Sequence, residues 1–186
     1  MPVFAASHDP KTPLQQSTNG ERTSMPEILE HEKHHTVGVI SDTHGLLRPG
    51  VIEALRGVEL IIHAGDIGTR QVIEALSAIA PVVAVRGNMD GGEWSRNLRD
   101  SEVVEVGRVL IYVLHDIQAL DLDPAAVGFS AVISGHSHRP SATRRKGVLY
   151  LNPGSAGPRR FKLPVSLAFL KIKKQTLDAR FVQFET

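Results

Sequence analysis

The stretch Val39-Ile-Ser-Asp-Thr-His-Gly45 decides the fold and carries the first candidate chemistry of this chain. A short apolar run ends there in a turn that contains Asp42 and His44. Side chains two residues apart on an extended segment point the same way. A carboxylate and an imidazole presented together at the carboxyl end of a strand indicate the beginning of a metal site.

Four later apolar runs end in residues of the same kind. Gly65-Asp66 follows the run 59–64, Gly87-Asn88 follows 82–85, His115 follows 109–114, and Gly135-His-Ser-His138 follows 131–134. Strand carboxyl ends share one edge of an α/β sheet, where ligands bind, so we expect these side chains to converge there. The predicted metal ligands are Asp42, His44, Asp66, Asn88, His115, His136 and His138.

This set of nitrogen and oxygen donors contains no sulfur and exceeds what one tetrahedral zinc ion requires. It suits two divalent ions that share a bridging carboxylate, and manganese, iron, zinc, nickel or magnesium are all compatible with it. Two such ions roughly 3.5 to 4 Å apart lower the pKa of a bridging water and neutralise a phosphoryl oxygen. The donor set therefore predicts hydrolysis of a phosphate ester by metal-bound hydroxide, without a protein nucleophile.

Composition limits the class of protein. The chain has 186 residues, of which 41% are hydrophobic and 22% charged, a formal net charge of +1, and no cysteine. These values are typical of one soluble domain, give no strong nucleic-acid signal and exclude disulfides, thiolate metal sites and a cysteine nucleophile. Without an apolar run long enough to span a bilayer or a signal-peptide pattern at Met1, we expect a cytoplasmic protein.

Residues 1–35 are rich in polar residues and proline, so we expect them to form a weakly ordered N-terminal extension. Residues 36–186 are predicted to form one α/β domain. A β-α-β-α-β order in the first half predicts a parallel sheet flanked by helices, and the hairpin signals that follow predict a second sheet. The expected strands are 36–41, 59–64, 82–85, 102–106, 109–114, 131–134, 141–146, 148–151, 165–171 and 177–184, with helices over 51–56, 70–80 and 120–127.

Together, Asp-x-His, Gly-Asp, Gly-Asn, His and Gly-His-x-His in this order resemble the calcineurin-like metallophosphoesterases. The chain is most similar to their small, cap-less members, the YfcE-type phosphodiesterases. The resemblance implies a four-layer α/β/β/α sandwich of two mixed sheets between helices, with a bound metal pair for which manganese is the first choice. It also implies a phosphodiesterase that acts on a small phosphate ester.

The family pattern also implies a role for each ligand. Asp42, His44 and His138 correspond to the ligands of a first metal, and Asp66 corresponds to the bridging carboxylate. The ligands of the second metal correspond to Asn88, His115 and His136. Asp66, Asn88 and His136 would act in catalysis through the metal-bound hydroxide.

The sequence departs from the family pattern at two positions. Met89 occupies the position at which larger relatives carry a histidine that can protonate the leaving group, so good leaving groups such as nitrophenol should be favoured. Asp116 follows His115 where glycine is often found.

The roles of several other polar residues remain open. His63 is either a core histidine or a residue that orients a ligand, and Asp90 either caps a turn or donates a proton. Trp94 either walls the crevice or packs under its loop. Among the arginines 86, 139, 159 and 160, we prefer Arg139 for stabilising phosphate charge, because it follows the histidine pair directly.

Two other functions fit the same fold. A non-catalytic interaction scaffold like the retromer subunit Vps29 could lose site histidines without penalty, whereas every ligand position is filled here. A metallohydrolase that cleaves another bond, such as an amide, fits the order and spacing less well. The sequence does not determine the natural substrate or whether the chain forms a homo-oligomer.

Overall fold

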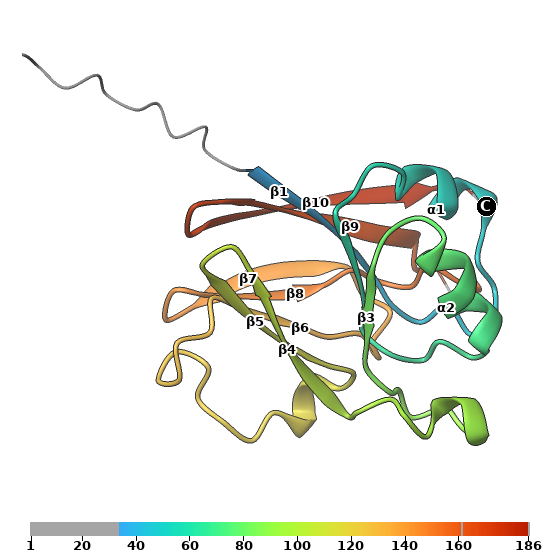
Figure 1. Cartoon of the computed structure of the whole chain (residues 1–186), viewed down its shortest axis with the longest axis horizontal. Helices are drawn as coiled ribbons and strands as arrows, with labels where there is room; N and C mark the ends of the chain where they lie inside the picture. Colours follow the sequence, from blue (N-terminus) through green and yellow to red (C-terminus); the bar gives the residue numbers. More distant parts are fainter. Residues whose placement is uncertain (1–33, 161, 186) are drawn as a thin grey trace, which may run out of the picture. The chain divides into compact units, whose positions relative to one another are not determined.

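The computed structural model describes residues 34–160 and 162–185. Its first sheet has the strand order β10-β9-β1-β2-β3. The strands are β1 (His34–Ile40), β2 (Leu60–His63), β3 (Val82–Ala84), β9 (Val165–Lys173) and β10 (Thr176–Phe184). β1, β2 and β3 are parallel, whereas β9 pairs antiparallel with both β1 and β10. The crossovers carry helices α1 (Pro49–Ala54) and α2 (Arg70–Ser77), which Figure 1 shows on the same side of this sheet.

The second sheet has the order β4-β5-β6-β8-β7. Its strands are β4 (Ser101–Val106), β5 (Val109–Leu114), β6 (Ala131–Ile133), β7 (Ser141–Arg145) and β8 (Val148–Asn152). β5, β6 and β8 are parallel, and the edge strands β4 and β7 are antiparallel to their neighbours. Both sheets are therefore mixed, as predicted.

The two sheets pack face to face, because alternate residues of their central strands are apolar. Val37 and Val39 of β1 share one buried cluster with Ile111 and Val113 of β5. Ile40 of β1 lies in a separate cluster with residues of α1 and α2 on the outer face of the first sheet. The period of two along each strand thus separates the core between the sheets from the core under the helices.

The predicted fold class, α/β with two mixed sheets and flanking helices, is confirmed, but the helix predicted over 120–127 is wrong. That segment contains a single turn, in which the carboxylate of Asp123 accepts a hydrogen bond from the backbone N–H of Ala125. Gly128, at φ 85°, and a bond from the N–H of Phe129 to the carbonyl of Pro124 end the turn. Side chain and backbone therefore satisfy each other locally, which competes with helix formation.

The outer face of the second sheet is consequently covered by irregular chain. A 3-10 helix, η2 (Ile117–Ala119), precedes the turn, and Leu120 and Ala125 pack against a buried cluster of the sheet that consists of Leu114, Val132 and Val148. The helical layer on this side of the sandwich is thus reduced to one short helix and a turn.

Several element boundaries differ from prediction. β1 begins at His34, two residues early, because His34 and His35 pair with Lys173 and Ile172 of β9. α2 ends at Ser77 instead of residue 80, and a 3-10 helix, η1 (Glu93–Ser95), was not predicted. The expectation for residues 1–33 lies outside the described residues.

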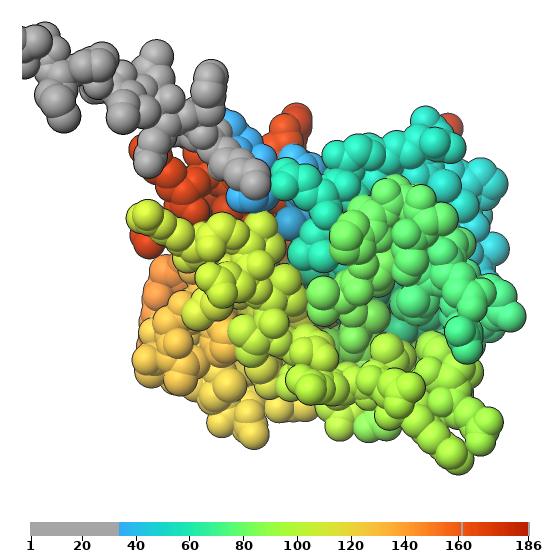
Figure 2. Space-filling model, in the orientation of Figure 1, coloured from blue at the N-terminus to red at the C-terminus, as the bar shows by residue number. Residues whose placement is uncertain are grey.

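The segment that carries η1 packs beside α2. In Figure 2 this yellow-green segment lies directly below the green α2, and Trp94 contributes to the apolar cluster under the helices. Trp94 also lines a cavity of about 520 Å³ together with Arg70 and Ile73 of α2. The tryptophan therefore packs under its own loop and does not wall the crevice of the predicted ligands. Within the described residues, no helix has the length and apolar character needed to cross a membrane.

Candidate metal centre

The seven predicted ligands lie on loops that follow the carboxyl ends of β1, β2, β3, β5 and β6. Backbone hydrogen bonds tie these loops together. The N–H of Asp42 donates to the carbonyl of Gly65 at 3.0 Å, and the N–H of His44 donates to the carbonyl of Asp66 at 2.9 Å. Between the second-sheet loops, the N–H of Gly135 donates to the carbonyl of His115 at 2.9 Å. The side chains therefore converge as expected, but they come from two sheets and not from one edge of a single sheet.

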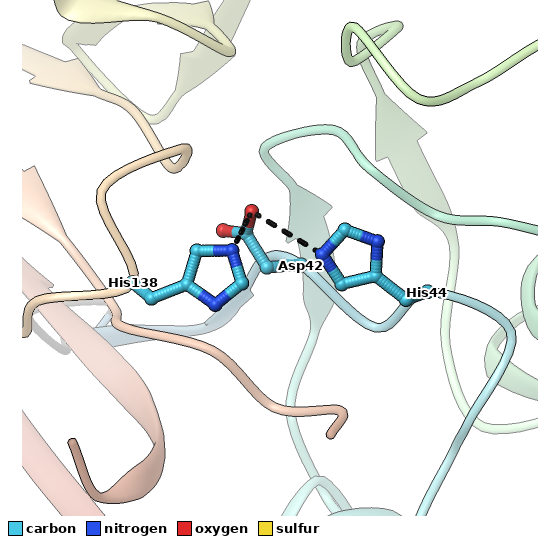
Figure 3. A group of neighbouring side chains, drawn as sticks. All are labelled: Asp42, His44 and His138. Atoms are coloured by element: carbon cyan, nitrogen blue, oxygen red, sulfur yellow. Dashed lines mark ion pairs between the residues drawn. The ribbon is translucent and has the colours of Figure 1, made fainter. Parts of the chain in front are cut away.

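Asp42, His44 and His138 form a first cluster (Figure 3). Nε2 of His138 lies 3.1 Å from Oδ1 of Asp42, and Nε2 of His44 lies 4.0 Å from the same oxygen. The two imidazole rings are stacked at 5.4 Å between centroids. Asp42 is fully buried, and its Oδ1 has no hydrogen-bond partner, a costly arrangement unless a cation binds there.

Asn88, His115 and His136 form a second cluster. Oδ1 of Asn88 lies 3.1 Å from Nε2 of His115 and 3.0 Å from Nδ1 of His136. The rings of His115 and His136 meet edge to face at 5.2 Å between centroids. An amide oxygen and two ring nitrogens thus point at one another.

Asp66 lies between the two clusters. Its Oδ2 is 3.8 Å from Nε2 of His44 in the first cluster and 3.4 Å from Nε2 of His115 in the second. Its Oδ1 accepts a hydrogen bond from the backbone N–H of Met89 at 2.8 Å. One carboxylate oxygen is therefore held by the backbone, while the other faces both clusters, as a bridging ligand requires.

The proton positions in the second cluster favour a cation. Nδ1 of His115 lies 2.7 Å from the carbonyl of Ala64, and a carbonyl only accepts, so this nitrogen carries a proton. In the neutral ring, Nε2 then presents a lone pair to Asn88 and Asp66. Burial lowers the pKa of His115, but hydrogen bonds to Asp66 and Ala64 outweigh it and the net pKa is raised. The surroundings of Nε2 of His115 therefore favour a positive charge at that atom.

The net pKa is lowered at two neighbouring predicted ligands, Asp66 and His44. Burial raises the pKa of Asp66, but the contacts with His115 and the N–H of Met89 outweigh it, and the net pKa is lowered. For His44, burial lowers the pKa and prevails over the carboxylates of Asp66 and Asp42. An ionised carboxylate beside a neutral imidazole is the protonation state that metal binding needs.

Left-handed backbone conformations are concentrated at the ligands. The described residues include seven non-glycine residues with positive φ, and five of them are predicted ligands: Asp42 (56°), His44 (45°), Asp66 (54°), His136 (65°) and His138 (57°). Such conformations cost free energy and persist at functional sites because the surrounding structure imposes them. The ligand pairs therefore converge through these turns and not, as predicted, through the period of two of an extended strand.

Asn152, at the end of β8, holds the loop that carries His136 and His138. Its Nδ2 donates to the carbonyl of Gly135 at 2.6 Å and to Oγ of Ser137 at 3.1 Å, and its Oδ1 accepts from the N–H of Gly154. Nearby, Oγ of Ser155 donates to the carbonyl of Asp42 at 2.9 Å. The turn after β8 thus supports both ligand loops.

The Asn152→Ala variant is expected to bind Mn²⁺ about 10- to 100-fold more weakly, because the loop with His136 and His138 loses two hydrogen bonds. Calorimetric titration of metal-free protein measures this change. Asn97→Ala, at an exposed position away from the ligands, is the matched control. Wild-type affinity in Asn152→Ala would show that the loop holds its shape without this side chain.

His63 is fully buried and supports the loop between two ligands. Oγ1 of Thr43 donates to the carbonyl of Ile67 at 2.9 Å, so Nε2 of His63, also at 2.9 Å, must donate to Thr43. Nδ1 of His63 has no partner. The hydrogen bond of the His63 ring is to Thr43, so His63 acts through Thr43 on the Asp42-Thr43-His44 turn.

This histidine predicts a pH dependence of stability. Burial lowers the pKa of His63 to about 4, below that of the unfolded chain. Between these two pKa values the unfolded chain binds more protons, so the contribution of His63 is complete above pH about 6.5 and is lost as the pH falls through 4. From pH 7.5 to 5, His63 should reduce the free energy of unfolding by about 2 kcal/mol.

Urea unfolding of metal-free protein at both pH values tests this expectation. His63→Gln keeps a donor for Thr43 and removes the titration, so its loss of stability should be smaller by that amount. Equal losses in wild type and His63→Gln would contradict the assignment.

The remaining polar candidates occupy different places. Arg139 is exposed, and in the described part of the chain its hydrogen bonding is limited to its backbone N–H and Ser137. Nη2 of Arg160, in contrast, lies 3.4 Å from Nε2 of His44. Both oxygens of Asp90 accept backbone hydrogen bonds, from Gly68 and Gly87, so Asp90 ties two loops together. The side chain of Met89 is 63% exposed and offers no donor.

The importance of Arg160 was difficult to foresee. In the sequence it is one of four candidate arginines, and Arg139 is preferred because of its position next to His138. The loop after β8 instead carries Arg160 to the first cluster, a contact that spans 116 residues of sequence. Only the basic run Arg159-Arg160 offered a signal.

Comparisons with known proteins identify the family to which the chain is similar. The family model described as the calcineurin-like phosphoesterase superfamily domain matches residues 36–175. A probable metallophosphoesterase of Methanothermobacter thermautotrophicus is 37% identical over 158 residues, which cover 79% of this chain and 91% of that protein.

Solved structures share the fold. A novel archaeal phosphodiesterase superimposes with a TM-score of 0.66 at 24% identity, covering 80% of this chain and 99% of its own. Vacuolar protein sorting 29 of Cryptosporidium parvum superimposes with a TM-score of 0.67 at 18% identity, covering 82% and 99% of the two chains. At these identities the likeness concerns the fold.

Proposed function

Because the chain belongs to the calcineurin-like phosphoesterase superfamily, we propose that it is a dinuclear metal-dependent phosphodiesterase. The observation that carries the proposal is the position of Asp66, whose Oδ2 faces a ligand of each cluster. A single metal site would not need a carboxylate between two sets of donors. Two divalent ions in these clusters would activate a water molecule and neutralise charge on the phosphoryl group.

In this proposal the residues of the site have different roles in metal binding and phosphate binding. Asp42, His44 and His138 would hold one ion, Asn88, His115 and His136 would hold the other, and Asp66 would be shared between them. The guanidinium of Arg160, beside His44, is placed to bind a non-bridging phosphoryl oxygen and to stabilise the charge that develops there. Arg139 remains a second candidate for this role.

Proton transfer to the departing alcohol has no dedicated side chain in this proposal. Met89 offers no proton, and Asp90 is 8% exposed with both oxygens engaged. The bond between phosphorus and the ester oxygen would then break with the proton supplied by water. Esters of acidic alcohols such as nitrophenol should therefore react much faster than alkyl esters.

The direct test is hydrolysis of bis-p-nitrophenyl phosphate by metal-stripped protein to which manganese, nickel, zinc or magnesium is returned. Manganese is expected to restore the most activity, with two ions bound per chain by elemental analysis. A protein that binds two ions and hydrolyses the ester with none of these metals would refute the phosphodiesterase assignment.

A non-catalytic scaffold is the alternative, supported by the likeness to vacuolar protein sorting 29. In that case the two clusters would bind ions but the protein would hydrolyse no ester. Substitution of the predicted ligands would then change the stability of the protein, and there would be no hydrolytic activity to lose. The same metal titration separates the two functions, because only the enzyme couples metal content to hydrolysis. Manganese as the native ion and a small phosphate ester as substrate remain predictions.

A further inference from the structure

A cavity of about 450 Å³ opens beside the second ligand cluster. Asn88, His115 and His136 line one side of it, and Leu114 and Ala119 provide apolar surface. Its volume lies within the range of about 300 to 1,000 Å³ typical of small-molecule sites. The cavity is therefore large enough for one substituent of a small phosphodiester.

The charged groups of this cavity are mostly acidic. Its lining contains Asp90, Asp100 and Asp116 and one guanidinium, that of Arg86. Arg86 is already paired, since its Nη2 and Nε lie 2.6 and 3.0 Å from Oδ1 of Asp100. The lining therefore lacks an unpaired cation that could bind an anionic substituent.

Asp116 is the acidic group best placed to contact a ligand. Its Oδ1 accepts a hydrogen bond from the N–H of Gln118 at 3.0 Å, which fixes the carboxylate at the start of η2. Its Oδ2 faces Nε2 of His136 at 3.9 Å, beyond hydrogen-bond distance, and the side chain is 36% exposed. Oδ1 is thus held in place, whereas Oδ2 lies beside the second ligand cluster and is open to a further partner.

The other end of the candidate site has the opposite charge. Arg160 lies beside His44, in the cluster that does not border this cavity. A phosphodiester bound across the ligands would then find a cation near one end and a carboxylate near the other. This asymmetry orients a substrate whose phosphate is anionic and whose retained substituent is neutral or cationic.

In-line displacement determines which substituent the cavity receives. The leaving group departs opposite the attacking oxygen, away from the ligand clusters, whereas the substituent that stays on phosphorus lies to the side. The cavity flanks the second cluster and is therefore suited to the retained group.

We propose that this cavity binds the retained alcohol of the phosphodiester and that Asp116 makes it selective for a cationic amino alcohol. The ammonium group would lie against Oδ2 of Asp116, with its carbon spacer on Leu114 and Ala119. The inference rests on the proposed phosphodiesterase function and adds to it the class of substrate.

The test uses two substrates of equal shape and the same nitrophenol leaving group. p-Nitrophenyl phosphorylcholine carries a quaternary ammonium, and p-nitrophenyl 3,3-dimethylbutyl phosphate replaces that nitrogen with carbon. We expect kcat/KM to be roughly fivefold higher for the cationic ester at low ionic strength. One molar salt should remove most of the difference.

The variant Asp116→Asn keeps the oxygen that accepts from Gln118 and removes only the charge. It should reduce the preference to about one, chiefly by lowering kcat/KM for the cationic ester. Asp121→Asn, an exposed aspartate of the same segment outside the cavity lining, should keep the wild-type preference. Calorimetric binding of phosphocholine and 3,3-dimethylbutyl phosphate provides a readout that does not depend on turnover.

Three outcomes would overturn the proposal. Wild type could treat the two esters alike, or Asp116→Asn could retain the preference. Asp116→Asn could also lower kcat/KM for both esters equally and weaken metal binding, which would assign Asp116 to holding the His136 ring instead. Failure of the phosphodiesterase function itself would look different, because neither ester nor bis-p-nitrophenyl phosphate would then be hydrolysed with any metal.

Discussion

The Asp66→Asn variant is expected to hydrolyse bis-p-nitrophenyl phosphate at least about 1,000-fold more slowly, equivalent to about 4 kcal/mol of transition-state stabilisation. Asn keeps the oxygen that accepts from the N–H of Met89, so the loop should remain in place. The substitution removes the negative charge that faces both clusters, and a neutral amide bridges two cations poorly. Steady-state kinetics with saturating manganese measure the loss.

The fold of this variant should be intact. Its circular dichroism spectrum should match wild type, and its content of bound metal should fall from two ions toward one. Asp178→Asn, at an exposed position of β10, is the matched control and should retain full activity. Wild-type activity in Asp66→Asn would be incompatible with a shared carboxylate and with the proposed mechanism.

The Asp42→Asn variant is expected to lose activity to a similar extent and yet to be more stable without metal. Asp42 is fully buried with an unpartnered Oδ1, and its φ of 56° is one that asparagine tolerates well. An amide N–H at that position could donate to Nε2 of His138, now 3.1 Å from the oxygen. Relief of the unpaired buried charge should add about 1 kcal/mol, or about 2 to 4 °C in Tm.

Thermal unfolding in the presence of a chelator and again with manganese tests this trade-off. Wild type should gain far more stability from manganese than Asp42→Asn, because the variant lacks a ligand of the first cluster. A less stable metal-free variant would mean that the Asp42 carboxylate supports the fold itself, through its contact with the N–H of His136 at 3.2 Å.

Much of the fold followed from local patterns in the sequence. Apolar runs and hairpin turn signals predicted the strands of both sheets with errors of one or two residues at most ends. The helix over 120–127 failed because its pattern was weak and Asp123, Pro124 and Gly128 offered a competing turn. The start of β1 and the end of α2 were predicted wrongly because they depend on tertiary pairing and packing, which the local pattern of one sequence does not contain.

The positions of the predicted ligands followed for a related reason. Each follows an apolar run, and parallel strands bring their carboxyl ends to one edge within each sheet, whereas the packing of the two sheets brings the two edges together. The identity of Asp66 as the shared carboxylate came from the family pattern, and its position between His44 and His115 is in keeping with it.

By itself, then, the sequence determined the order of strands along the chain, the strand ends at which polar residues lie and the chemistry of those residues. The tertiary structure alone decided how the predicted ligands meet, which is through left-handed turns at five of them. It also placed Gly135 so close to Asp42 that a Cβ atom at position 135 would lie 2.8 Å from Oδ2 of Asp42. It also decided that Arg160 reaches His44, that Asn152 holds the histidine loop and that Asp116 borders a cavity. These relations join residues far apart in the chain, and only packing of the two sheets sets the distances between them.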